Sequence, residues 1–204
     1  MKAVVFDLDG TLVDSLPGIE ASVRFALSRA LPGTAMPDLR SAVGPPIATM
    51  FARLWPELDP DGLARLLAEF RSHYDAGGCL LSEPYPGVRE TLPALGGSLF
   101  VLTNKPVNPS RRILKHLGLL DFFTDVMAPD AITPPYASKP DGARLLQERF
   151  GLLPAETALV GDGPDDARAA EACGFRFIAA SYGYGQVAEA TPLNQFSDIE
   201  RFLL

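Results

Sequence analysis

The chain has 204 residues, 47% of them hydrophobic, and its 18 basic and 25 acidic side chains give a formal net charge of −7. This length and composition suffice for one or two compact domains with a buried core, which excludes a chain that is disordered throughout. The negative charge excludes the global positive field that sequence-independent nucleic-acid binding requires, so we expect no nucleic-acid partner. Any anionic substrate must be attracted by a local site.

No stretch of the sequence approaches the roughly 18 consecutive apolar residues of a membrane-spanning helix. The apolar start of the chain is interrupted by Asp7 and Asp9, which is unlike a secretion signal. The two cysteines, Cys79 and Cys173, are too few for a disulfide framework and lack the spacing of metal ligands. We therefore expect a soluble, cytoplasmic protein without a membrane partner.

Short apolar runs rich in β-branched residues predict the strands of a buried sheet. They lie at 2–7, 98–103, 125–128, 157–161 and 175–180. Helical patterns separate the later runs, and those at 108–118 and 140–151 each start near a proline and end at a glycine. Strands that alternate with helices in this way predict an α/β fold: a Rossmann-like, three-layer core in which helices cover both faces of a parallel sheet.

Residues 15–83 have a different pattern, with amphipathic helices and no clear strand. One helix is expected to begin at Asp59, and another follows Pro17. Their apolar residues recur at helical spacing, at Leu63, Leu66, Leu67, Phe70 and Tyr74 in the former and at Ile19, Val23, Ala26 and Leu27 in the latter. Two prolines and a glycine just beyond this segment predict a stiff hinge. We therefore predict a core formed by 1–14 and 84–204, with a helical insertion at 15–83.

Polar side chains follow three of the predicted strands where each strand ends. Asp7 and Asp9 end the first, Thr103 follows the second, and Asp162 and Asp166 follow the strand at 157–161. An Asp-Gly pair by itself equally indicates a plain turn, but the carboxyl ends of parallel strands share one edge of a sheet. Clustered carboxylates repel one another unless a cation is present. Because oxygen ligands are typical of Mg²⁺, and no His or Cys cluster indicates zinc, this edge predicts a magnesium site.

Four polar segments therefore stand out along the chain. They are Asp-x-Asp-Gly-Thr-Leu-x-Asp-Ser at 7–15, Thr103 after a strand, Lys139-Pro140, and Gly161-Asp162-x-x-x-Asp166. In order and spacing they resemble the motifs of the haloacid dehalogenase-like hydrolase superfamily, and the resemblance covers nearly the whole chain. The helical insertion after the first motif, with Tyr85-Pro-Gly87 beyond it, is similar to the phosphoglycolate phosphatase group, in which the insertion is a helical cap.

The resemblance implies a role for each residue at this edge of the sheet. Asp7 would be the nucleophile that attacks phosphorus, and Asp9 the general acid and base. Asp9 would protonate the leaving alcohol and later deprotonate the water that hydrolyses the aspartyl-phosphate. Thr103 and the backbone amide of Asn104 would hold phosphate oxygens, while Lys139 would steady Asp7 and stabilise charge on the phosphate.

The resemblance also implies how Mg²⁺ is held. Its ligands would be the side chain of Asp7, the backbone carbonyl of Asp9 and Asp162, with Asp166 as the supporting acid. Family members usually carry Ser or Thr directly after the acid of the last motif, where this chain has Gly163. Because the missing hydroxyl could order a metal-bound water, we expect a lower metal affinity and retained activity.

Other polar residues have plainer interpretations. Lys105 lies at a loop and helix entry, where a lysine is more often solvated than catalytic. His73 and His116 lie near the ends of predicted helices, where histidine favours the helix dipole without any further role. Asp14 and Ser15 are interpreted as caps of the first helix of the insertion.

The loop Val43-Gly-Pro-Pro46 is either an ordinary linker between helices or, as the resemblance implies, a part of the cap that approaches the active site. Arg40 precedes it and is a candidate partner for a substrate carboxylate, although a surface arginine without such a role is the more common case. Arg71 has a weaker claim.

The residues and the resemblance together predict a magnesium-dependent phosphatase that hydrolyses a small phosphomonoester such as phosphoglycolate through an aspartyl-phosphate. A nucleotidase, a pyrophosphatase or a sugar phosphatase would use the same core residues, and the cap would contact the rest of the substrate. A phosphomutase would need an acid–base residue in the cap, and a non-catalytic phosphate-binding protein is expected to lack one of the site residues. Dehalogenation is disfavoured because it does not need the magnesium acids. We expect a small phosphorylated metabolite as partner, and a monomer or homodimer.

Overall fold

A computed structural model describes residues 1–187 and 191–203 of the chain. Six strands form one sheet in the order β5-β4-β1-β6-β7-β8, and each adjacent pair is parallel. The strands are β1 (Ala3–Phe6), β4 (Ser98–Leu102), β5 (Asp125–Met127), β6 (Thr157–Gly161), β7 (Arg176–Ala180) and β8 (Pro192–Leu193). The predicted parallel sheet of an α/β fold is therefore confirmed, and β8, with two residues, is an additional strand at its edge.

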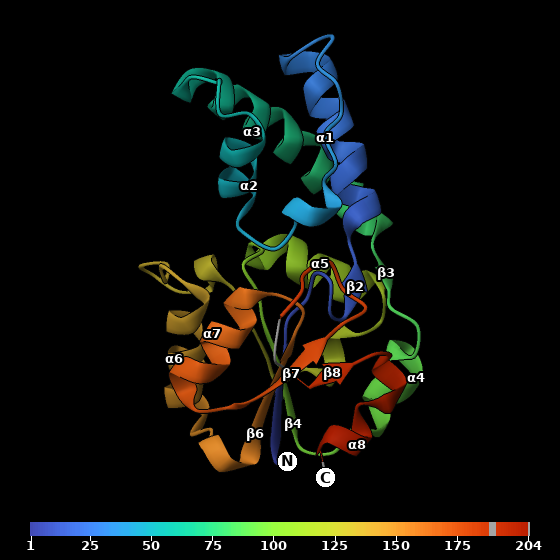
Figure 1. Cartoon of the computed structure of the whole chain (residues 1–204), viewed down its shortest axis with the longest axis vertical. Coiled ribbons are helices and arrows are strands. Elements are labelled where there is room, and N and C mark those ends of the chain that lie inside the picture. The colour runs from blue at the N-terminus through green and yellow to red at the C-terminus, as the bar shows by residue number, and fades with distance from the viewer. Residues whose placement is uncertain (188–190, 204) are drawn as a thin grey trace.

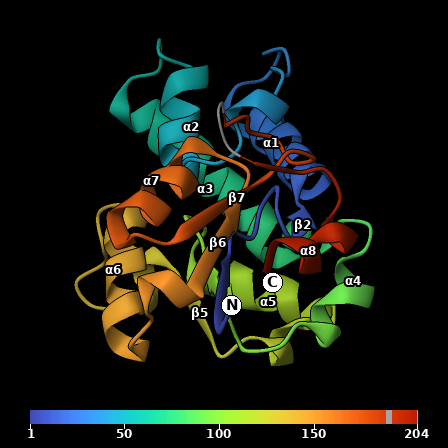
Figure 2. The same ribbon diagram turned by 60° about the horizontal axis from the view of Figure 1, so that its bottom comes forward.

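Helices cover both faces of this sheet, as Figures 1 and 2 show. On one face lie α6 (Lys139–Phe150) and α7 (Pro164–Cys173), and on the other lie α4 (Val88–Thr91), α5 (Val107–His116) and α8 (Glu200–Leu203). Because side chains alternate along a strand, β1 contributes to two core clusters: Val5 packs with Leu146 of α6, whereas Val4 and Phe6 pack with Ile113 of α5. This arrangement is the predicted three-layer core.

Local sequence signals explain where α6 begins and ends. The Ser138 hydroxyl accepts the backbone N–H of Asp141 at 3.4 Å, and Pro140 occupies the first turn. Gly151 follows the helix in the left-handed conformation, with a φ of 63°. The helix therefore starts one residue earlier than its proline indicates, and Lys139 is its first residue.

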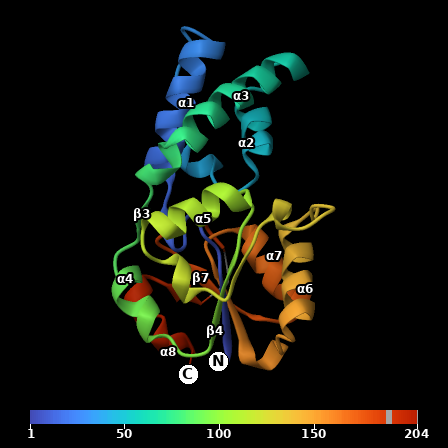
Figure 3. The same cartoon turned by 180° about the vertical axis from the view of Figure 1, so that it is seen from behind.

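Three further helices lie beyond the carboxyl ends of the strands, at the top of Figures 1 and 3. They are α1 (Leu16–Ala30), α2 (Ile47–Leu54) and α3 (Pro60–Ala76). α1 and α3 were predicted and pack against each other, whereas the short α2, which directly follows Pro45 and Pro46, was not assigned from the sequence. Phe51 of α2 meets Phe70 of α3 edge to face, with 5.4 Å between the ring centroids. We refer to residues 15–83 as the cap.

A small antiparallel ribbon connects the cap to the sheet. β2 (Val13–Asp14) pairs with β3 (Glu83–Pro84), so the chain leaves the core and returns to it side by side. Beyond β3, the backbone N–H of Tyr85 donates to the carbonyl of Leu12 at 3.1 Å. The segment predicted as a hinge is therefore hydrogen-bonded to the part of the chain that leads from the core into β2.

Short 3₁₀ turns complete the described chain, at Arg40–Ala42, Gly78–Leu81, Leu92–Ala94, Leu120–Phe122, Pro129–Ala131, Pro154–Glu156 and Phe196–Asp198. Among the residues that are described, no helix combines the length and apolar character needed to span a membrane.

Candidate active site

The carboxyl ends of β1 and β6 bring three buried acids together. Asp7 follows β1, Asp162 follows β6, and Asp166 lies in the first turn of α7. One carboxylate oxygen from each lies within 4.8 Å of the others. β1 and β6 are neighbours in the sheet, so residues far apart in the sequence meet at its edge.

Lys139 places its ammonium group between two of these acids. Its Nζ lies 2.6 Å from Oδ1 of Asp7 and 2.6 Å from Oδ1 of Asp166. Burial alone would lower the pKa of Lys139, but the charges of Asp166 and Asp7 outweigh burial and raise it above the ordinary value. The lysine is therefore a fixed positive charge beside Asp7.

The cluster nevertheless carries an excess of negative charge. Burial raises the pKa of Asp7 well above its ordinary value; Lys139 opposes this shift, and the charges of Asp166 and Asp162 add to it. Burial is also the main cause that raises the pKa of Asp162. In the described part of the chain, Lys139 is the one side-chain cation in ion-pair contact with the three acids. A buried set of oxygen donors with surplus negative charge fits a hard divalent cation.

Asp162 is held in place by the loop that follows β7. Its Oδ2 accepts the backbone N–H groups of Tyr184 at 2.7 Å and Gly185 at 2.9 Å. The surrounding backbone approaches so closely that a Cβ at Gly10 or Gly183 would overlap the Asp162 side chain. Gly10 also has a φ of 85°, which side chains rarely adopt. Nothing in the sequence pattern indicated this loop, because its contribution comes from backbone groups.

Asp9, two residues beyond Asp7, pairs with Lys105. The Lys105 Nζ is 3.0 Å from Oδ2 of Asp9, and the lysine side chain is 8% exposed. Burial by itself would lower the pKa of Lys105, but Asp9 and Tyr74 raise it above its ordinary value. The interpretation of Lys105 as a solvated lysine was therefore wrong. Its position directly after Thr103 and Asn104, at the end of β4, was the available signal.

Thr103 and Asn104 lie where the sequence predicted them, at the end of β4. The buried Thr103 hydroxyl accepts the backbone N–H of Lys105 at 3.1 Å. The Asn104 side-chain amide donates to the carbonyl of Gly44 and to a carboxylate oxygen of Asp165, each at 3.1 Å. The loop at 43–46 thus approaches the site, as the resemblance implied, and contacts it through Gly44.

Two cavities open between the cap and the core. The first has a volume of about 620 Å³ and is lined by Asp9, Lys105 and, from α3, Arg71 and Tyr74. The second has a volume of about 860 Å³ and is lined by the acidic cluster and Lys139. Both volumes lie within the range of about 300–1,000 Å³ that is usual for small-molecule sites.

Asp7 belongs to both cavities. Among the described residues, Asp9 lines the first and not the second, whereas Asp162 and Asp166 line the second and not the first. The 43–46 loop lines both. Asp7 and Asp9 therefore share the first cavity, and Asp7 also faces the second, which the other two acids line.

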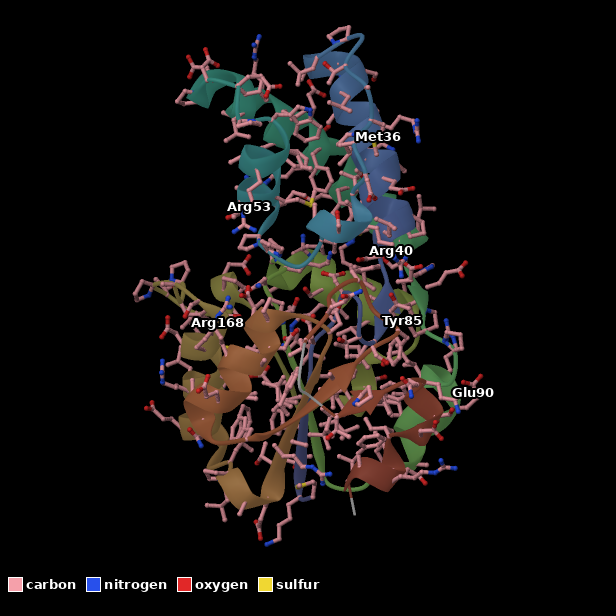
Figure 4. The ribbon with its side chains drawn as sticks, viewed as in Figure 1. Met36, Arg40, Arg53, Tyr85, Glu90 and Arg168 are labelled. Atoms are coloured by element: carbon pink, nitrogen blue, oxygen red, sulfur yellow. The ribbon has the colours of Figure 1, made fainter. Side chains whose placement is uncertain are left out.

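The two candidate arginines of the cap, Arg40 and Arg71, have different surroundings. Arg71 lines the first cavity. Arg40, labelled at the base of the cap in Figure 4, donates to the carbonyl of Gly183 at 3.3 Å and lies 5.4 Å from the centroid of the Tyr184 ring. Of the two, Arg71 lines a described cavity and Arg40 does not; neither contact tests the proposed role in binding a substrate carboxylate.

The contacts of the remaining polar residues support a structural role for His73 and Asp14, whereas the interpretation of Ser15 as a cap was wrong. His73 Nδ1 is 2.9 Å from the Ser22 hydroxyl, and its ring stacks on Phe25. Asp14 accepts the backbone N–H of Leu16 at 3.1 Å, at the start of α1, whereas the Ser15 side chain makes no capping bond. These residues have structural roles in the cap.

Comparison with known proteins shows the same family as the motifs. Residues 1–174 match the haloacid dehalogenase-like hydrolase family. A phosphoglycolate phosphatase of Rhodospirillum rubrum is 36% identical over 217 residues, covering 97% of this chain and 87% of that protein. One of Cereibacter sphaeroides is 36% identical over 193 residues, covering 90% and 87%.

A solved structure supports the same assignment. The crystal structure of a predicted phosphoglycolate phosphatase from Haemophilus somnus superposes with a TM-score of 0.88 and 28% identity, covering 100% of this chain and 98% of that chain. The chain is therefore a phosphatase that belongs to the haloacid dehalogenase-like hydrolases, in their phosphoglycolate phosphatase-like group.

Proposed function

We propose that the protein is a magnesium-dependent phosphatase that hydrolyses a small phosphomonoester such as phosphoglycolate through an aspartyl-phosphate. The observation that carries this proposal is the position of Asp7. Asp7 belongs to the buried acidic cluster with its fixed lysine, and it also lines the first cavity together with Asp9. Such a site can neutralise a phosphate on one side and take up a leaving group on the other.

In the first half of the reaction, the carboxylate of Asp7 forms a bond to phosphorus while the bond from phosphorus to the ester oxygen breaks. Asp9 gives its proton to that oxygen, so the product leaves as an alcohol. Lys139, 2.6 Å from Asp7, keeps the nucleophile oriented and stabilises the charge on the phosphate oxygens. Thr103 and the amide of Asn104 hold these oxygens.

In the second half, Asp9 takes a proton from a water molecule whose oxygen attacks the phosphorus of the aspartyl-phosphate. The bond from Asp7 to phosphorus breaks, inorganic phosphate leaves, and both carboxyl groups return to their starting states. Asp9 lines the first cavity, which supports a leaving alcohol and an attacking water on that side. The cap over the site excludes bulk water from the intermediate.

The buried acidic cluster supports magnesium as the cation. Asp7, Asp162 and the backbone carbonyl of Asp9 would hold it, with Asp166 as the supporting acid. When bound, Mg²⁺ offsets the repulsion between these carboxylates and the incoming phosphate. Asp7 would then be ionised and nucleophilic despite the burial that raises its pKa.

The two parts of the chain are proposed to contact different parts of the substrate. The core, 1–14 and 84–204, contacts the phosphate, and the cap, 15–83, contacts the rest of the substrate. The short ribbon of β2 and β3 at both boundaries supports this division. All the residues of the mechanism come from one chain, which fits a monomer or a homodimer as the working unit.

Phosphoglycolate is the proposed substrate because similar proteins are named phosphoglycolate phosphatase and because Arg71 lines the cavity that also contains Asp9. An arginine there would pair with the carboxylate that distinguishes phosphoglycolate from a simple alkyl phosphate. The test is phosphate release from phosphoglycolate, a nucleoside monophosphate, a sugar phosphate and pyrophosphate, with Mg²⁺ and with a chelator.

Release that requires Mg²⁺ and is fastest with phosphoglycolate is the expected result. Preference for another member of the panel would replace the substrate and keep the mechanism. No release from any member would overturn the phosphatase and favour a phosphomutase or a non-catalytic binder. Asp7→Asn should lower turnover by at least about a thousandfold, while Asp121→Asn, at an exposed position, serves as the matched control.

A further inference from the structure

Lys105 lies in the core and contacts both Asp9 and the cap. Its Nζ lies 3.0 Å from Oδ2 of Asp9 and 2.8 Å from the hydroxyl oxygen of Tyr74, to which it donates. At its other end, the backbone N–H of Lys105 donates to Thr103 Oγ1 at 3.1 Å. The lysine is therefore fixed both by its backbone and by its ammonium group.

Tyr74 is a rigid part of the cap. It lies on α3, its ring stacks on Phe70 with 5.0 Å between centroids and an interplanar angle of 17°, and Phe70 in turn packs against Phe51 of α2. The Lys105 Nζ also lies 4.9 Å from the centroid of the Tyr74 ring, a cation–π contact. The position of Lys105 thus depends on where the aromatic core of the cap lies.

The two carboxylate oxygens of Asp9 have different contacts. Oδ2 pairs with Lys105, whereas Oδ1 is buried and has no hydrogen-bond partner among the described residues. A buried carboxylate oxygen without a partner is costly unless another group completes it. Asp9 lines the first cavity as a residue, but Oδ1 is enclosed, so a leaving-group oxygen or a water would reach Oδ1 only after a small movement of the groups around it.

We propose that Lys105, held by Tyr74 of the cap, is a positioning residue that fixes the carboxylate of Asp9 through Oδ2 for its proton transfers to the leaving group and from the attacking water. This inference rests on the proposed phosphatase mechanism and assigns two residues that the motifs do not include. Proton transfer then depends on the cap lying over the core, because Tyr74 belongs to the cap.

The test compares two esters that differ in their need for a proton. An alkyl phosphate such as phosphoglycolate leaves as an alcohol and needs protonation, whereas 4-nitrophenyl phosphate leaves as a stable phenolate. Since kcat/KM reports on the steps up to phosphorylation of the enzyme, Lys105→Met should lower kcat/KM about 10- to 100-fold for phosphoglycolate and at most about threefold for the nitrophenyl ester.

One variant with a smaller change and two control variants complete the experiment. Tyr74→Phe keeps the ring and removes the hydroxyl, so it should shift the ratio of the two kcat/KM values in the same direction by about three- to tenfold. Lys115→Met, at an exposed helix position, and Tyr85→Phe, at a tyrosine whose buried hydroxyl has no described partner, should leave the ratio unchanged.

Equal losses on both esters in Lys105→Met and Tyr74→Phe would show a structural role and overturn the proposal, as would unchanged ratios. If Lys105→Met does not fold, the ratio in Tyr74→Phe decides alone. An inactive wild-type protein would instead overturn the phosphatase itself, so the two failures are distinguishable.

Discussion

The ammonium group of Lys139 lies 2.6 Å from Oδ1 of Asp7, at the carboxyl end of the central strand β1. The same nitrogen pairs with Asp166, so its removal would leave three buried carboxylates without a side-chain cation. Removing one partner of a buried ion pair typically costs about 3–5 kcal/mol. The contact therefore serves stability as well as catalysis.

Lys139→Met should lower kcat by about 100- to 1,000-fold and destabilise the metal-free protein by about 3–5 kcal/mol. Lys139→Arg should restore part of the stability but little of the activity, because a planar guanidinium cannot replace a compact ammonium group between two carboxylates. Urea unfolding in chelator and steady-state kinetics check the two effects. Equal recovery of both quantities in the arginine variant would contradict this expectation.

Asp7→Asn should abolish turnover and stabilise the metal-free protein at neutral pH. Asp7 and Asp162 have raised pKa values, so the folded state binds more protons than the unfolded state between the ordinary and the folded pKa. Their favourable contribution is complete below the ordinary pKa and is lost as pH rises through the folded pKa. The metal-free wild type should therefore become less stable across that range.

Thermal unfolding in chelator from about pH 4 to about pH 8 measures this slope. The slope should be shallower in Asp7→Asn, which should gain about 1–3 kcal/mol at the upper end because a repelled, buried charge is gone. Adding Mg²⁺ to the wild type should offset the loss. A wild-type protein whose stability in chelator rises with pH would contradict the assignment.

Gly163→Ser should lower the Mg²⁺ concentration needed for half-maximal activity, by up to about tenfold. A Cβ at this position would lie 3.6 Å from Oδ2 of Asp166, an ordinary contact, and the φ of −117° suits any residue. The hydroxyl that the resemblance implies at this position can therefore be added without strain. Gly163→Ala is the control, because it adds the Cβ without the hydroxyl; an equal effect of both variants would show that the hydroxyl is irrelevant.

Arg71→Ala should raise the KM for phosphoglycolate by about tenfold while sparing 4-nitrophenyl phosphate, since the nitrophenyl ester has no carboxylate to pair with the arginine. Arg40→Ala is the matched control, because Arg40 contacts Gly183 and Tyr184 and is not among the residues that line either described cavity. A selective effect at Arg40 and none at Arg71 would restore the sequence-based ranking.

Tyr184→Phe should destabilise the protein by about 1–3 kcal/mol. The Tyr184 hydroxyl donates to Asp14 at 2.6 Å and accepts the backbone N–H groups of Ser15 at 2.7 Å and Leu16 at 3.0 Å. Its removal leaves these groups without that partner at the start of the cap. Tyr85→Phe, which removes a hydroxyl without a described partner, should cost less than half as much in the same urea titration.

The amino-acid sequence by itself determined the layers of the fold and the order of the site residues. Buried strands and helices have local periodicities, and the helices at 60–76 and 139–150 carry their own start and stop signals. A parallel sheet then requires that Asp7, Thr103 and Asp162 share one edge. The helices α2 and α7 and the two-residue strand β8 were not assigned from the sequence, because α2 and β8 are short and α7 is built largely from small residues.

Only the tertiary structure decided which groups touch. The packing of the segments decides the ion pair of Lys105 with Asp9 and the hydrogen bonds that Asp162 accepts from the backbone of Tyr184 and Gly185. It also decides that Arg71, and not Arg40, lines the first cavity. These contacts join segments that are remote in sequence, and the contacts to Asp162, which lie within the core, use backbone groups that every residue possesses. Side-chain type and spacing determine local structure, whereas a contact between distant segments depends on the packing of all the elements between them.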